Sequence, residues 1–204
     1  MFNSQTYGKL NIELVVDKLL EFYNRTKQYD SPVQIIIGTD SQNHSETKIV
    51  TVIAITCEGH GGIYFYEVNY LNRIDNVRQK LFTETGMSID VADNILSVME
   101  NNNRYEELFN AATFTIHVDA GRSDKGKTKE LIPAIAGWIR SVGYEYEISC
   151  LAEIARALYT TPDYLLGFEE EKDPFEKEAL CILQGIKDDT VRKHFQRSRV
   201  RSQR

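Results

Sequence analysis

Two aspartates each close a short apolar run of the sequence. Asp40 follows residues 34–39, and Asp119 follows residues 114–118. Such a run is typical of a strand buried on both faces, so each carboxylate is expected at the open end of a sheet. Carboxylates suit hard cations such as Mg2+ or Mn2+, and two such ions can hold a phosphodiester for in-line attack. The pair indicates a candidate metal site, with a simple turn-starting role as the alternative for each aspartate.

Strand and helix signals alternate along the rest of the chain. Apolar residues recur at helical spacing behind Asn11, whereas a glycine-rich turn at 58–62 separates two strand-like segments. The pattern predicts strands at residues 33–39, 48–57, 63–70, 113–118 and 144–149. It predicts helices at residues 11–29, 74–100, 126–142 and 151–159, the second broken near Gly86 and restarted by a Ser88 cap.

Three separated motifs carry a resemblance to a known family. Residues 38–42 read GTDSQ, residues 78–85 read RQKLFTET, and residues 117–121 read HVDAG and run on to Lys127 and Thr128. Together they resemble the YkuK-like family of ribonuclease-H-like proteins over about residues 10–160. The element order and this resemblance imply an α/β fold with a mixed five-stranded sheet and helices on both faces. In that fold the first and fourth strands are neighbours, which would bring Asp40 and Asp119 together.

The resemblance also supplies further acids. Glu84 lies where ribonuclease-H-like nucleases place a metal-ligating acid on the first long helix, so Asp40, Glu84 and Asp119 are the expected catalytic residues. The alternative for Glu84 is an exposed helix glutamate in a weak ion pair with Lys80. The family's fourth acid falls near Ala157, where this chain has none. Glu153, one turn earlier, is the expected substitute ligand unless it lies on the helix surface.

Basic residues gather in two places that could contact nucleic acid. The loop after Asp119 leads into a helix start, where lysines and free backbone donors can cradle a phosphate. Residues 191–204 carry six basic residues and no acid, whereas residues 1–190 carry 18 basic and 30 acidic residues. The alternatives are solvated loop charge and a terminus that binds nothing. The expected nucleic-acid-binding residues are Lys125, Lys127, Lys129, Arg192, Lys193, Arg197, Arg199 and Arg201.

Length and composition bound the organisation of the chain. With 204 residues, 42% of them hydrophobic, it can bury one good core. We expect a ribonuclease-H-like domain over residues 1–160 and a helical extension with the basic tail over residues 161–204. No apolar stretch approaches a membrane span, no signal-peptide layout opens the chain, and its three cysteines share no metal-ligand spacing, so we expect a cytoplasmic protein with reduced thiols.

Two functions follow from these observations. The first is a metal-dependent nuclease that hydrolyses RNA or DNA with Mg2+ or Mn2+ held by Asp40, Glu84 and Asp119. The second is a non-catalytic nucleic-acid-binding or assembly module that keeps the fold with an incomplete metal site. An acyl-transfer role for Ser41 ranks below both, because no nucleophile-elbow glycine pattern surrounds it. The type of nucleic acid and the oligomeric state are left open.

Overall fold

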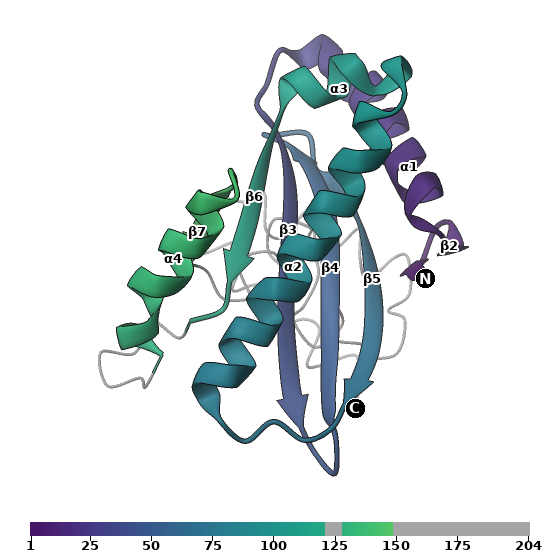
Figure 1. Ribbon diagram of the computed structural model, residues 1–204. Coiled ribbons are helices and arrows are strands. Elements are labelled where there is room, and N and C mark those ends of the chain that lie inside the picture. Colours follow the sequence, from purple (N-terminus) through teal and green to yellow (C-terminus); the bar gives the residue numbers. More distant parts are fainter. Residues whose placement is uncertain (121–127, 149–204) are drawn as a thin grey trace, which may run out of the picture. The chain divides into compact units, whose positions relative to one another are not determined.

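A single mixed β-sheet organises the chain. The computed structural model describes residues 1–120 and 128–148. Its seven strands lie in the order β2-β1-β5-β4-β3-β6-β7 (Figure 1). They are β1 (Phe2–Ser4), β2 (Gly8–Leu10), β3 (Val33–Asn43), β4 (Thr47–Cys57), β5 (Gly62–Leu71), β6 (Ala112–Val118) and β7 (Glu145–Ile148). The mixed α/β class is therefore confirmed, whereas the predicted count of five strands is wrong.

The two additional strands form a hairpin at the N-terminus. Strand β1 pairs antiparallel with β2, and Asn3 of β1 also pairs with Tyr66 at the outer edge of β5. Gly8 has a φ of +71°, a conformation that glycine adopts without strain. Phe2 and Leu10 are partners across the hairpin and are both buried in the core. Strands of three residues are too short to show an alternating pattern, which is why the sequence did not indicate them.

The remaining five strands combine an antiparallel meander with two parallel pairings. Strands β3, β4 and β5 are consecutive and antiparallel, whereas β6 pairs parallel with β3 and β7 pairs parallel with β6. The prediction that the Asp40 and Asp119 strands are parallel neighbours is therefore confirmed. Both faces of the central strands are buried: Ile37 and Ile53 point to one face and Ile36 and Ala54 to the other. This double burial explains why these segments read as continuous apolar runs.

The described helices cover one face of the sheet, so within residues 1–120 and 128–148 the prediction of helices on both faces is met on one face alone. They are α1 (Ile12–Thr26), α2 (Val77–Glu100), α3 (Glu106–Ala111) and α4 (Ile132–Ser141), with short 3-10 turns η1 (Lys27–Tyr29), η2 (Asn103–Tyr105) and η3 (Lys129–Leu131). Helix α2 crosses in front of β3 and β4 (Figure 1). None of the described helices is long and apolar enough to cross a membrane. The helix predicted at 151–159 and the extension over 161–204 lie outside the described residues.

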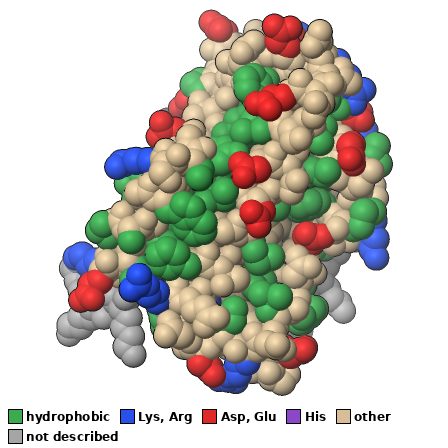
Figure 2. Space-filling view, in the orientation of Figure 1, with side chains coloured by type: hydrophobic (Ala, Val, Ile, Leu, Met, Phe, Trp, Pro, Cys, Tyr) green, Lys and Arg blue, Asp and Glu red, His purple; other side chains and the backbone are tan. Residues whose placement is uncertain are grey.

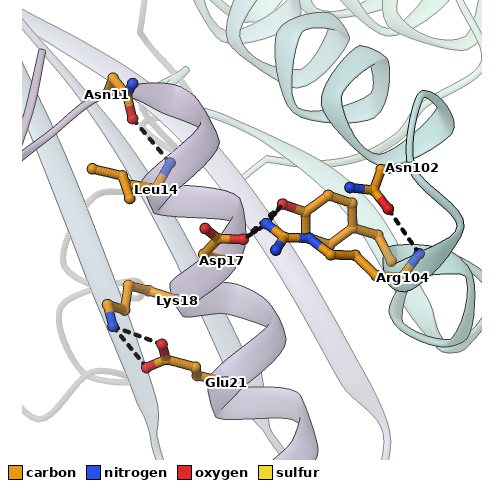
Figure 3. A network of polar contacts seen from close by, with 8 residues as sticks. Asn11, Leu14, Asp17, Lys18, Glu21, Asn102 and Arg104 are labelled. Carbon is orange, nitrogen blue, oxygen red and sulfur yellow. Dashed lines mark hydrogen bonds and ion pairs between the residues drawn. The ribbon is translucent and has the colours of Figure 1, made fainter.

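Helix α1 is fixed at its start and along its side (Figure 3). The Asn11 side chain caps the helix by accepting a hydrogen bond from the Leu14 N–H at 3.0 Å. Farther along, the Asp17 carboxylate accepts a hydrogen bond from the Tyr105 hydroxyl at 2.7 Å and pairs with Arg104. These contacts join α1 to η2, the turn between α2 and α3. They belong to the scaffold and lie on no predicted site.

Helix α2 runs without interruption through Gly86, so the predicted break is wrong. Glycine in a helix costs about 1 kcal/mol relative to alanine. Here its missing side chain lets Trp138 of α4 approach: an added Cβ would lie 3.3 Å from the edge of the indole. Trp138 stacks on Phe82 with the ring centres 5.8 Å apart, and Figure 2 shows hydrophobic side chains where α2 and α4 meet. Ser88 caps nothing, because it is buried in mid-helix with its hydroxyl directed to Thr39.

Candidate metal centre

Asp40 lies within β3 and not at its end. The strand continues to Asn43 because it forms a long hairpin with β4, where Asp40 pairs with Val50. The parallel partner β6 is shorter, since its last residue, Val118, pairs with Thr39. Asp40 is therefore the first β3 residue beyond that parallel pairing, and its side chain is partly exposed. The expectation of a strand-ending aspartate was wrong for β3, yet the neighbouring strand does end beside it.

Asp119 directly follows the last residue of β6. Since Thr39 and Val118 are the last parallel pair, Asp40 and Asp119 are the residues that follow this pair on the two segments. The chain turns immediately afterwards, with the Ala120 N–H donating to the Val118 carbonyl at 3.0 Å. Asp119 is partly exposed. The topology therefore brings the two predicted aspartates to the same end of the parallel β3–β6 pair.

Glu84 enters the same region from helix α2. It is only 6% exposed, so the alternative of a solvent-exposed helix glutamate is wrong. Its Oε1 accepts a hydrogen bond from the Ser41 hydroxyl at 2.6 Å. The pKa of Glu84 is raised to about 7. Burial and the charges of Asp40 and Asp119 raise it, whereas the Ser41 hydrogen bond and the charge of Lys80 lower it. Glu84 therefore lies within electrostatic reach of both Asp40 and Asp119.

Asp40 shows the same conflict between burial and charge in a milder form. Burial raises its pKa, while the Ser41 N–H and the nearby Lys80 ammonium act in the opposite direction. The hydrogen bond from the Ser41 N–H to the Asp40 Oδ1 is 2.7 Å long. The cost of ionising such buried carboxylates falls when a cation binds beside them or when they take up protons.

Ser41 and Lys80 also belong to this site; the sequence indicated Lys80 as an ion-pair partner of Glu84, and that pair is present. Ser41 touches three groups: its N–H donates to Asp40, its hydroxyl donates to Glu84, and its carbonyl accepts from the Lys80 ammonium. Strand alternation puts Ser41 on the same face as Thr39, toward α2, and Lys80 is one helical turn before Glu84. Each periodicity puts its residue on the correct face of its own element, whereas the contact between them depends on how β3 and α2 pack. A hydroxyl bound to Glu84 also gives no support to an acyl-transfer role.

The three acids have the right ligand atoms for a hard divalent cation, but their side chains are not yet spaced to hold one. Three carboxylates with two raised pKa values are suitable ligands for Mg2+ or Mn2+. Within residues 1–120 and 128–148, however, no three such side chains are already grouped closely enough to hold an ion. Lys80, whose Nζ lies 3.8 Å from the Glu84 Oε1, is the cation present among these acids in the described part. Binding a metal would therefore require side chains to rearrange.

Of the other predicted site residues, Lys129 alone lies within the described part of the chain. Lys129 is exposed and begins η3. Glu153, Lys125, Lys127 and the basic residues of 191–204 lie outside the described residues, so their roles stay predictions. The same holds for the domain boundary near residue 160.

With the fold and the acids located, comparison with known proteins decides the family. The model of the family called Ribonuclease H-like matches residues 14–157. The chain belongs to this family. It is also 28% identical over 155 residues to the YkuK protein of Bacillus subtilis (strain 168), covering 72% of this chain and 88% of that protein. The YkuK-like, ribonuclease-H-like identification is thereby confirmed.

The solved structures that match this chain resemble it only weakly. The catalytic domain of Mos1 mariner transposase matches with 13% sequence identity and a TM-score of 0.32, covering 89% of this chain and 85% of that one. A second structure of that domain, with Raltegravir and Mn, matches with 12% identity and a TM-score of 0.29 over 89% of this chain and 86% of that one. Similarity at this level carries no argument about the reaction of this chain.

Proposed function

We propose that this ribonuclease-H-like protein is a nuclease that hydrolyses phosphodiesters with Mg2+ or Mn2+. One observation carries the proposal. Three acids from separate elements, Asp40 of β3, Glu84 of α2 and Asp119 after β6, lie close enough that two of them raise the pKa of the third. Such perturbed acids are typical of functional sites.

The position of each site residue indicates its role. Asp40 and Asp119 are partly exposed at the edge of the parallel pair, so they can meet a metal-bearing substrate from solvent. Glu84 approaches from the helix side, and Ser41 orients both Glu84 and Asp40 through its hydroxyl and its N–H. Held by these carboxylates, Mg2+ or Mn2+ would supply Lewis-acid activation of the phosphate and of water. Lys125, Lys127 and Lys129 are proposed to contact phosphates near the same edge, and Glu153 to add a ligand.

Substitution of the aspartates tests the proposal. We expect millimolar Mn2+ to support cleavage of single-stranded RNA, double-stranded DNA or an RNA–DNA hybrid, and Asp40→Asn and Asp119→Asn each to abolish it. Each substitution keeps the side-chain shape and removes one negative charge from the cation site. Asp90→Asn is the matched control, because Asp90 is exposed on α2 and should leave cleavage unchanged. Cleavage that survives in both site variants would identify a contaminating nuclease or another active site.

A non-catalytic nucleic-acid-binding module is the second candidate. It is favoured by two features, the lack of a ready three-acid grouping among the described residues and the absence of an acid at Ala157. A full-length protein that binds one of the three nucleic acids but cleaves none with Mn2+ would establish this candidate over the nuclease.

A further inference from the structure

Lys80 lies among the acids of the candidate centre. It belongs to the first turns of α2, one helical turn before Glu84. Its ammonium donates to the Ser41 carbonyl and lies 3.8 Å from the Glu84 Oε1. The Lys80 side chain is 28% exposed and that of Glu84 is 8% exposed, so this pair is better shielded from water than a surface ion pair. The contact is therefore strong enough to matter to the site.

The charge of Lys80 acts on two of the three acids. It lowers the pKa of Asp40 and of Glu84, against the larger effect of burial on each. In the absence of a bound metal, the ammonium thus offsets part of the repulsion among the carboxylates. A divalent ion would offset the same repulsion. The Lys80 ammonium and the ion would therefore stabilise the same negative charges.

We propose that Lys80 is a built-in counter-cation of this site and competes with the divalent metal for Glu84. This inference rests on the proposed metal-dependent function. The contact with Glu84 is long for a hydrogen bond, and the other contact is to a backbone carbonyl, so a long flexible lysine can leave both without breaking the fold. Among the described residues no three acids are grouped closely enough to hold an ion, and the Lys80 ammonium already lies against Glu84. Full use of Glu84 as a ligand requires the Lys80 ammonium to move away.

Mn2+ titration of full-length variants tests this competition. The dissociation constant is measured from free Mn2+ by electron paramagnetic resonance, and unfolding is followed in parallel in EDTA. Removing a unit charge next to a divalent ion should lower the Mn2+ dissociation constant of Lys80→Met by at least about tenfold. Without metal, Lys80→Met should melt at a lower temperature than the wild type, and Mn2+ should raise its melting temperature more.

Arg78→Met is the matched control. Arg78 is exposed on the same helix, its guanidinium lies over the Phe82 ring, and the substitution removes the same charge two residues away. It should change Mn2+ affinity less than twofold. Lys80→Gln provides a second test if Lys80→Met fails to fold, with the same expected gain in affinity.

The outcomes separate this inference from the proposed function. Wild-type Mn2+ binding that is lost in Asp40→Asn, together with equal or weaker binding by Lys80→Met, would overturn the counter-cation role and leave the metal site intact. An equal gain in Lys80→Met and Arg78→Met would reduce the effect to overall charge and also overturn it. Mn2+ binding by neither the wild type nor the Lys80 variants would overturn the metal site and the competition together.

Discussion

Glu84→Gln should abolish a specific pH dependence of stability in the metal-free protein. The pKa of Glu84 is about 7 in the folded protein, against an ordinary value of 4.5. Between these two pH values the folded protein keeps the proton while the unfolded chain has lost it. The stabilisation that this proton provides is therefore complete below about pH 4.5 and is lost as the pH rises to about 7.

The size of the effect follows from the same pKa values. Each pH unit between them changes the free energy of unfolding by about 1.4 kcal/mol, so the whole interval is worth about 3 kcal/mol. Glutamine keeps the shape of the side chain and an oxygen that can accept from the Ser41 hydroxyl. Glu84→Gln should therefore match the wild type near pH 4.5 and exceed its stability by about 3 kcal/mol at pH 7.5. Asp40 titrates in both proteins, so the difference isolates Glu84.

Urea unfolding at pH 4.5 and 7.5 in EDTA measures this difference. Trp138 is the chain's single tryptophan and stacks on Phe82, so its fluorescence reports loss of the α2–α4 packing. Glu58→Gln serves as the control, since it removes an acid from an exposed turn. Parallel stability curves for the wild type and Glu84→Gln across this range would refute the argument, because they would show that Glu84 ionises without a burial penalty.

Three further outcomes follow from other contacts. Asn11→Ala removes the α1 cap and should lower the free energy of unfolding by about 1 kcal/mol in urea titration; no change would show that the cap adds nothing. Ser41→Ala leaves the buried Glu84 without its donor and should cost about 1–3 kcal/mol at pH 7.5, with weaker Mn2+ binding in calorimetry; unchanged Mn2+ affinity would contradict its orienting role. Deleting residues 191–204 should weaken nucleic-acid binding and flatten its salt dependence, and equal salt slopes would remove the tail from the interface.

The sequence predicted those parts of the fold that depend on periodicity. The apolar runs of β3 and β6 and the helical spacing of α1 are long enough to show their period, and each element was located by it, although β3 runs on to Asn43. The β1–β2 hairpin and the short α3 carry too few residues for such a signal. The false break in α2 came from Gly86, whose conformational cost is outweighed by the close approach of Trp138, a contact between distant residues.

The candidate site divides in the same way. Asp40 and Asp119 were found from local patterns, because a polar residue after a buried run stands out. Glu84 came from the family resemblance, and its burial depends on packing between α2 and β3 that no local window contains. The roles of Ser41 and Lys80 depend on where the β3 and α2 periods meet, so they become visible only when both elements are placed.

The energetics of Glu84 distinguish a structural acid from a functional one. Its ionised form costs about 3 kcal/mol at neutral pH, while a glutamine could keep the shape and the Ser41 hydrogen bond. The fold therefore gains nothing from the negative charge itself. That charge becomes favourable only beside a cation. In the described part of the chain, Lys80 is such a cation and offsets part of the cost. A divalent ion would carry twice the charge of Lys80, and the carboxylates of Asp40, Glu84 and Asp119 are the oxygen ligands that such an ion prefers. Glu84 thus weakens the metal-free fold at neutral pH, and a bound metal would offset that cost.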